Sequence, residues 1–293
     1  MNVQFQIEKY HRPRDPVQAV EILSRYGGKA RVIAGGTDLL PLRPGIKQID
    51  NIDHLVDIAD LQLNYIQSDD DHIRIGAATS IATIGASPLF LSNPYRALSE
   101  AANSHSTPTI RNRATIGGNL CNASPCADLA LPLLVMEAVL VAGGPGGQRE
   151  IPPESFFKGA NYTALNTDEL LLEIRIPRCS PNAATAFLKL RRQQTAIDMA
   201  MVNVASMLLG NKGRCKVARI ALGAVGPVSL RAKHAESLLK GAVLGQEIFQ
   251  KAAVTAARQV RPISDVRATA AYRREMVRVM VRRSLENSMR RCG

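Results

Sequence analysis

The sequence predicts a protein of the α+β class, in two domains that meet near residue 177. Helical and strand patterns are mixed along the whole chain. Two glycine-centred stretches, 34–38 and 114–119, interrupt these patterns in the first half, and residues 177–182 have turn composition that no long periodic pattern crosses. With 293 residues, 46% of them hydrophobic, the chain can bury a sizeable core in one large domain or two ordinary ones.

The first elements are a helix, a strand and a second strand. Residues 15–23 begin with an acidic cap and a proline and continue with an apolar helical period. Residues 30–34 read as a short buried strand that leads directly into the first glycine stretch. Residues 72–77 alternate like a strand, and Thr79 or Ser80 can cap the helix that follows.

The middle of the chain continues the mixed pattern. We expect a helix over 94–104 and a buried apolar helix over 129–141. A glycine-rich turn at 143–147 precedes strands near 149–151 and 170–176.

Beyond the boundary, two alternating segments predict strands at 201–205 and 217–224. Residues 236–239, 246–259 and 270–288 read as helices.

The chain carries no recognisable export or membrane signal. Its longest apolar stretch, 129–142, contains Pro132 and Glu137 and is too short to span a bilayer. The first eight residues lack the basic flank and apolar core of a secretory signal. Five cysteines form no disulfide framework and no four-thiolate metal site. We therefore expect a cytoplasmic protein without a metal of its own.

The net charge of +12 is concentrated at the C-terminus. Residues 256–293 hold ten arginines and three acids. Arg274, Arg278 and Arg282 recur every four residues, as one stripe of a helix. A solvated helix face or docking onto an acidic protein explains this stripe better than nucleic acid does, because only 4% of the residues are aromatic and no nucleic-acid motif is present.

The glycine stretches are the candidate ligand site. Each combines paired glycines with a hydroxyl and a polar residue, which lets a backbone approach a phosphate. Gly35-Gly36 lacks the third glycine of the dinucleotide fingerprint, so loop amides and not one helix dipole would hold the phosphates. Asp128 can accept a hydrogen bond from a nucleotide hydroxyl. Two such loops suggest one long ligand held from both sides, and a dinucleotide is the obvious candidate.

These residues also carry a family resemblance. Segments 33–39 and 110–120, continuing to 123–125 and Asp128, resemble the FAD-binding medium subunits of the molybdenum hydroxylases, the family of xanthine dehydrogenase, carbon monoxide dehydrogenase and 4-hydroxybenzoyl-CoA reductase. The resemblance covers almost the whole chain. It implies a two-lobed mixed α/β FAD-binding domain over 1–177, of the PCMH/VAO-like type with lobes at about 1–60 and 61–177, and a smaller C-terminal α+β domain with an antiparallel sheet over 178–293.

The resemblance further implies a set of residues around non-covalently bound FAD. One loop would wrap the pyrophosphate and a second would oppose it. Single residues would lie on the nucleotide side, make an apolar contact to the cofactor, lie near the flavin, and occupy a position where relatives often have a bulky residue. In that order these are Arg31, Val32, Ile33, Ala34, Gly35, Gly36, Thr37 and Asp38; Thr115, Ile116, Gly117, Gly118 and Asn119; Asp128; Leu171; Lys189; and His105. We expect Gly117→Val to give a folded subunit without flavin.

By the same resemblance the chain is an electron-transfer subunit, an oxidoreductase without catalytic residues of its own. A large subunit would carry the molybdenum cofactor and a small subunit the [2Fe-2S] clusters, in a heterotrimer or a dimer of heterotrimers. Electrons would pass from the clusters through this subunit to an external acceptor, or the reverse in a reductase. A self-sufficient FAD-dependent oxidase is the main alternative, and a basic nucleic-acid-binding protein is a weaker one.

Two departures from the family are visible. Segment 193–200 matches the loop that approaches the flavin ring but has no aromatic residue, so we hypothesise that Ile197 and Asp198 control access to the ring. Cys121 and Cys126 resemble the 4-hydroxybenzoyl-CoA reductase branch, whose cluster-bearing insertion is missing here. We therefore predict no iron-sulfur cluster.

Overall fold

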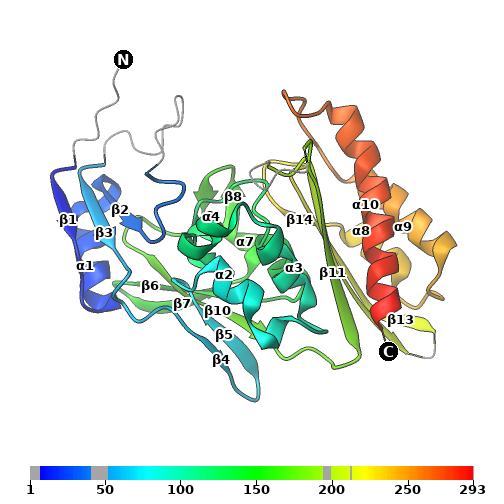
Figure 1. Ribbon diagram of the computed structural model, residues 1–293, viewed down its shortest axis with the longest axis horizontal. Coiled ribbons are helices and arrows are strands. Elements are labelled where there is room, and N and C mark those ends of the chain that lie inside the picture. The colour runs from blue at the N-terminus through cyan, green and yellow to red at the C-terminus, as the bar shows by residue number, and fades with distance from the viewer. Residues whose placement is uncertain (1–6, 41–51, 194–198, 212, 293) are drawn as a thin grey trace.

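The computed structural model describes residues 7–40, 52–193, 199–211 and 213–292. Three sheets follow one another along the long axis of the molecule, and helices pack between and outside them (Figure 1). This mixed architecture confirms the predicted α+β class. The division into domains at residue 177 stays a prediction; at that point the chain leaves the second sheet and, through residues 178–182, enters the third.

The first sheet is small and parallel, in the order β1-β3-β2. Helix α1 begins as predicted, with the Asp15 carboxylate accepting a 2.8 Å hydrogen bond from the N–H of Gln18. Its residues Ala19 and Leu23 are buried against the sheet. The elements are β1 (Lys9–His11), α1 (Pro16–Tyr26), the 3₁₀ turn Gly27–Lys29, β2 (Ala30–Ile33) and β3 (His54–Asp57).

Three rings cluster where α1 ends. The Tyr26 and His54 ring centroids are 3.7 Å apart, and His11 Nε2 lies 3.3 Å from His54 Nδ1. Burial, reinforced by the charge of His54, lowers the pKa of His11. The ring of His11 therefore favours the neutral state within this lobe.

The second sheet is antiparallel, in the order β4-β5-β10-β6-β7. Its strands are β4 (Ile66–Ser68), β5 (His72–Gly76), β6 (Val139–Gly144), β7 (Gly147–Ile151) and β10 (Leu170–Pro177). The helices beside it are α2 (Ile81–Ala86), the 3₁₀ turn Pro88–Phe90, α3 (Arg96–Ser104), α4 (Pro108–Arg113), α5 (Ile116–Cys121), α6 (Ala130–Val135) and α7 (Pro153–Phe156). A small hairpin, β8 (Phe157–Gly159) and β9 (Tyr162–Thr163), follows.

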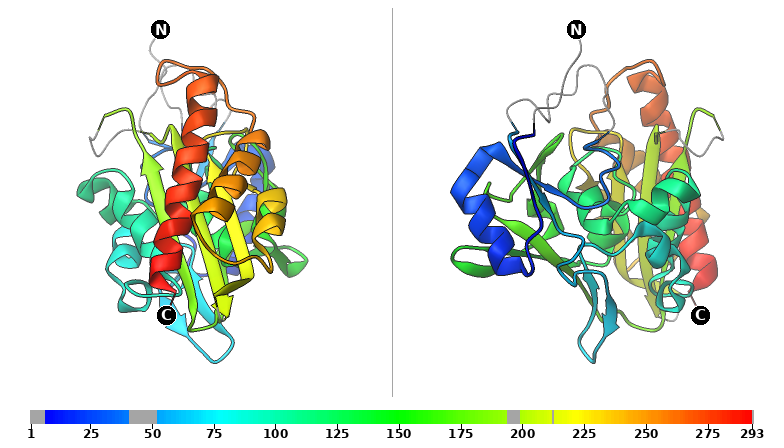
Figure 2. Two further views of the ribbon diagram at one scale, coloured as in Figure 1. Left: turned by 90° about the vertical axis from the view of Figure 1, so that its right-hand side faces the viewer. Right: turned by 60° about the vertical axis from the view of Figure 1, so that its left-hand side comes forward.

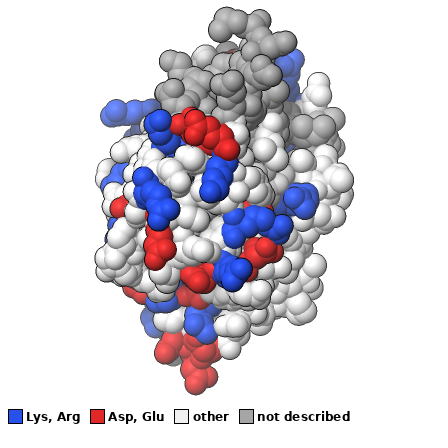
Figure 3. Space-filling view, turned by 90° about the vertical axis from the view of Figure 1, so that its left-hand side faces the viewer, with Lys and Arg blue, Asp and Glu red and all other residues white. Residues whose placement is uncertain are grey.

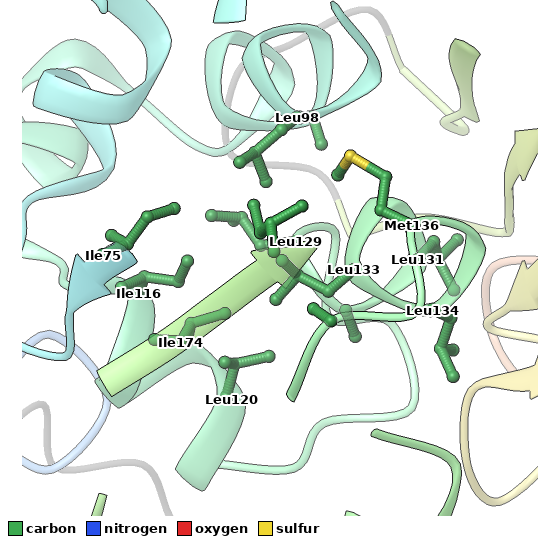
Figure 4. Packing of buried hydrophobic residues seen from close by; sticks show 14 of the residues in the cluster. Ile75, Leu98, Ile116, Leu120, Leu129, Leu131, Leu133, Leu134, Met136 and Ile174 are labelled. Atoms are coloured by element: carbon green, nitrogen blue, oxygen red, sulfur yellow. The ribbon is translucent and has the colours of Figure 1, made fainter. Parts of the chain in front are cut away.

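The predicted helix over 129–141 is wrong in its second half. Helix α6 ends at Val135, the chain turns at Glu137 with φ +51°, and Val139 begins strand β6. A buried helix and a buried strand are both apolar on every side, so the sequence pattern could not separate them. Figure 4 shows the leucines of α6 in the main core, with Ile116 of α5 beside Ile75 and Ile174.

The third sheet is an antiparallel meander, β11-β12-β13-β14. Helix α10 lies along its outer face (Figure 2), while α3 and α6 contact the inner face. Because both faces are covered, β12 is buried on both sides and longer than the predicted 201–205. The elements are β11 (Ala183–Leu190), β12 (Val202–Asn211), β13 (Arg214–Gly223), β14 (Leu230–Arg231), α8 (Lys233–Leu239), α9 (Gln246–Arg258) and α10 (Ala270–Arg291).

Arg273 fastens the first turn of α10 to this sheet. It is 3% exposed and donates to the carbonyls of Met201 at 2.7 Å and Ala224 at 3.2 Å. Its other terminal nitrogen lies 2.8 Å from Asp265 Oδ1. The Asp265–Arg273 pair thus ties the loop between α9 and α10 to the ends of β12 and β13.

Within the described residues, none of the helices combines the length and the apolar character needed to cross a membrane.

Candidate functional site

A cavity of about 430 Å³ opens between the first and second sheets. Three segments form most of its wall: β2 with the loop that follows, the turn into α5 with its first turn, and residues 161–171, which run from β9 to the start of β10. The two glycine stretches therefore face one cavity, as a ligand held from both sides requires.

The glycine stretches touch each other at Gly35. A Cβ built on Gly35 would stand 1.9 Å from the carbonyl oxygen of Arg113 and 3.0 Å from Cα of Ala114. These are backbone atoms, which cannot move aside as a side chain can. Glycine is required at position 35 because the first loop packs directly on the chain entering the second.

The first loop supplies a run of unused donors. In the described part of the chain, the backbone N–H groups of Gly35, Gly36, Thr37 and Asp38 have no hydrogen-bond acceptor, and all four residues line the cavity. Gly36 has φ +69°, the left-handed conformation that glycine adopts at little cost. Successive free N–H groups around such a residue make a concave site for an anion.

The backbone N–H groups of the second loop donate hydrogen bonds to other atoms of the protein. The N–H groups of Ile116 and Gly117 bind the carbonyls of Thr79 and Ala77, at 3.0 and 2.8 Å. Those of Gly118 and Asn119 bind the side chain and carbonyl of Thr115. This loop therefore forms a wall of the cavity and does not provide the anion cradle that the sequence suggested for both loops.

Glycine is required at position 117 for a separate structural reason. A Cβ there would meet the carbonyl oxygen of Ala77 at 2.6 Å and its Cβ at 2.8 Å. Gly117→Val is therefore expected to disturb the packing of α5 on the end of β5. The folded, flavin-free protein expected from the sequence is not what this geometry supports.

One side chain of the second loop is unsatisfied in a way that points to a ligand. Asn119 Oδ1 is buried and has no hydrogen-bond partner among the described residues, and Asn119 lines the cavity. Buried polar atoms are nearly always paired in native proteins. A donor group of a bound molecule would supply the hydrogen bond that Asn119 Oδ1 lacks.

A buried polar cluster lies beside the cavity. The Asp128 side chain, 3% exposed, accepts from Lys189 Nζ at 2.6 Å and from Asn203 Nδ2 at 3.1 Å. His105 Nδ1 lies 3.4 Å from the same carboxylate. His105 lines the cavity, whereas Asp128, Lys189 and Asn203 lie behind it. The cluster joins α3 and the turn before α6 to strands β11 and β12.

Most of the predicted site residues meet in this one region. The cavity wall includes all of Arg31–Asp38, together with His105, Leu171, Thr115, Gly117, Gly118 and Asn119. Ile116 instead points into the core beside Ile75 (Figure 4). Asp128 and Lys189 are not among the lining residues; Asp128 is joined to the wall by its contact with His105, and Lys189 pairs with Asp128.

Two features of the site were not predicted from the sequence. Residues between 161 and 169 contribute to the cavity beside the predicted Leu171, but their turn-like pattern carries no ligand signal. Asn203, 0% exposed, anchors Asp128; the available signal was an asparagine inside the otherwise apolar strand 201–205.

The cysteines are buried or half-buried thiols, and part of segment 193–200 lies outside the described residues. Burial raises the pKa of the Cys121 thiol to about 12 and also raises that of Cys126. Across the described residues, no three His, Cys, Asp or Glu side chains are placed to bind a metal ion. Ile197 and Asp198 lie outside the described residues, so their role stays a hypothesis.

The arginine stripe on α10 is partly neutralised. Arg278 binds Glu275 at 2.8 Å, and Arg282 binds Glu286 at 2.8 Å on the same helix. On the face formed by the N-terminal lobe, acidic and basic side chains are interspersed (Figure 3). The net positive charge is thus not concentrated on that face.

Comparisons with known proteins agree with this arrangement. Residues 3–179 match the family model described as the FAD binding domain in molybdopterin dehydrogenase. Residues 185–288 match the model described as the CO dehydrogenase flavoprotein C-terminal domain.

Individual relatives match over nearly the full length. The chain is 33% identical to the carbon monoxide dehydrogenase medium chain of Hydrogenophaga pseudoflava, over 97% of this chain and 98% of that one. It is 34% identical to the corresponding chain of Afipia carboxidovorans, over 96% of each. The solved carbon monoxide dehydrogenase from Hydrogenophaga pseudoflava that lacks the Mo-pyranopterin moiety superposes with a TM-score of 0.92, at 33% identity, covering 98% of this chain and 99% of that one.

Proposed function

Since this chain belongs to the family of FAD-binding medium subunits of the molybdenum hydroxylases, we propose that it is the electron-transfer subunit of a heteromeric enzyme. In that enzyme a large subunit carries the molybdenum cofactor and a small subunit carries [2Fe-2S] clusters. The chain stands between those clusters and an external electron acceptor, or works in the reverse direction in a reductase.

The observation that carries the proposal is the run of free backbone N–H groups from Gly35 to Asp38 on the cavity wall. Four successive donors on the cavity wall suit the pyrophosphate of FAD, which has oxygen acceptors and negative charge. The unpaired Asn119 Oδ1 suits a hydroxyl of the same ligand. The residues present therefore fit FAD.

Each part of the site has a separate task in this proposal. Gly35–Asp38 bind the pyrophosphate, and the second loop, held in place by its own hydrogen bonds, closes the opposite wall. Leu171, 2% exposed, gives an apolar contact. Bound FAD would supply the redox chemistry, because a flavin can exchange electrons singly or in pairs.

Lys189 and Asp128 serve together in this proposal. Their 2.6 Å contact places the acid expected on the nucleotide side and the base expected near the flavin in one cluster, next to His105. We therefore assign all three to the same end of the cofactor.

The partners of the chain are proposed from the family. A heterotrimer, or a dimer of heterotrimers, would use the positive charge of this chain in docking. All five cysteines are free thiols, which agrees with the proposed cytoplasmic location.

The test is purification of the chain in its native complex and as an isolated subunit. We expect a yellow isolated subunit that binds one FAD per chain non-covalently, and a complex that also contains molybdenum and iron. Raising the salt concentration is expected to dissociate the complex.

Two outcomes would contradict the proposal. An isolated chain that fails to bind FAD in a fluorescence titration excludes the flavin site. A yellow chain that oxidises a substrate without any partner favours a self-sufficient oxidase instead.

A further inference from the structure

The backbone at His105 is held from two sides. His105 follows the last turn of α3. Arg111 donates from one nitrogen to the carbonyls of His105 at 3.1 Å and Ser106 at 3.0 Å, and Arg191 donates to the carbonyl of Ser104. Ser106 has φ +42°, a left-handed conformation that costs a non-glycine residue energy. Three consecutive carbonyls thus fix the position from which the imidazole enters the cavity wall.

The carboxylate of Asp128 decides which ring nitrogen of His105 carries the proton. Nδ1 lies 3.4 Å from Oδ2 of Asp128, an atom that can only accept in the ionised state. An unprotonated Nδ1 would turn its lone pair toward this oxygen and be repelled. Lys189 Nζ, 2.6 Å away, already balances the charge of the carboxylate, so the ring has only to donate its Nδ1–H to this oxygen.

Asn203 keeps the carboxylate in this orientation. Its Nδ2 donates to the other oxygen of Asp128 at 3.1 Å. Its Oδ1 occupies the space left by Gly223 on the neighbouring strand, where a Cβ would come within 2.3 Å. Turning the amide over would place Oδ1 against the carboxylate, so the amide has one favourable orientation. Asn203 is therefore a positioning residue that acts through Asp128.

We propose that this cluster holds His105 as the Nδ1–H tautomer, so that Nε2 presents a hydrogen-bond acceptor to the cavity. The inference rests on the proposed function, because the ligand it addresses is FAD. It specifies that His105 receives an N–H or O–H donor of the cofactor and does not bind one of its carbonyl oxygens. The His105 side chain is 21% exposed and lines the cavity, which leaves it accessible to such a donor.

The first measurement is independent of FAD. The full chain, labelled with ¹⁵N-histidine and freed of flavin, is studied by long-range ¹H–¹⁵N correlation spectroscopy at slightly alkaline pH. The His105 signals are identified by their loss in His105→Phe. We expect the Nδ1–H pattern for His105, although Nε2–H predominates in free histidine. In Asn203→Leu, which releases one oxygen of Asp128, we expect the His105 signals to shift toward a mixture of both tautomers.

The second measurement is the dissociation constant of FAD, from flavin fluorescence during titration. Loss of one neutral hydrogen bond in His105→Phe is expected to raise the constant about two- to tenfold. His234→Phe is the matched control: His234 lies exposed on α8, and its ring has no hydrogen bond within the described structure. It should bind FAD as the unmodified chain does.

An Nε2–H tautomer or an imidazolium at His105 in the unmodified chain would overturn the inference. So would a His105→Phe protein that binds FAD as tightly as the His234→Phe control. If the unmodified chain binds no FAD while His105 is in the Nδ1–H state, the proposed function fails and the tautomer assignment survives.

Discussion

The sharpest test of the site is the contact between the two glycine loops. In Gly35→Ala the new methyl group would stand 1.9 Å from the Arg113 carbonyl oxygen, although Cβ atoms essentially never approach a heavy atom within 3.0 Å. The loops must therefore separate by about 1 Å or more. Because both walls of the cavity move with these loops, the change acts directly on the proposed FAD site.

The magnitude follows from the cost of overpacking. Forcing one extra carbon into a well-packed site costs about 1–3 kcal/mol. If the folded protein relaxes by opening the loops, and FAD binding must close them again, the dissociation constant rises by roughly 5- to 150-fold. Titration of the flavin-free subunit with FAD, followed by fluorescence, measures this directly, and thermal unfolding measures any part of the cost borne by the fold.

Gly146→Ala is the matched control. Gly146 lies in the turn between β6 and β7, has an ordinary φ and has no heavy atom within 4 Å of the position of its Cβ. This variant should bind FAD and unfold as the unmodified chain does. If Gly35→Ala binds FAD within twofold of the control and melts at the same temperature, the loops do not form the site as described.

Three further predictions concern charged and titratable groups. Lys189→Met leaves the buried Asp128 unpaired and should lower the free energy of unfolding by about 3–5 kcal/mol, seen as a lower melting temperature; adding Asp128→Leu should recover part of the loss, and no recovery would argue against the pair. Although desolvation raises it, hydrogen bonds from two backbone N–H groups of its own loop and from Arg273 hold the pKa of Asp265 down at about 2. Asp265→Asn should therefore lower the free energy of unfolding at neutral pH by about 1 kcal/mol, because solvent screens this partly exposed carboxylate. In the unmodified chain this stabilisation should be present above pH 3.8 and be lost as the pH falls through about 2, as measured by acid unfolding. Burial lowers the pKa of His11, so stability should be full above pH 6.5 and decline as the pH falls below it; an identical decline in His11→Phe would show that His11 is not responsible.

The helices with explicit end signals could be predicted from the sequence. The acidic cap and proline before α1 act as expected, and α9 and α10 begin at the residues that the apolar period indicated, 246 and 270. These signals are local, because a cap satisfies N–H groups only a few residues away. Local chemistry is sufficient to locate such elements.

The secondary structure of the apolar stretch that begins at residue 129 could not be predicted from local sequence alone. Helix α6 and strand β6 share one hydrophobic composition, and the choice between them depends on the sheet partners of β6. Those partners, β7 and β10, include residues some 30 positions away. The pairing, and not the composition, makes the second half a strand.

The sequence by itself determined the family and the flavin, and it singled out the two loops that we propose form the flavin site, because motifs that combine paired glycines, a hydroxyl and an amide are few and specific. Only the tertiary structure decided what each glycine does. Gly35 and Gly117 are glycines because backbone from another segment occupies the place of their side chains. The free N–H groups belong to the first loop alone, since the second loop uses its own on residues 77–79 and 115. A sequence motif shows which residues occur at a position. The physical reason for each residue depends on atoms that distant parts of the chain bring into contact with it.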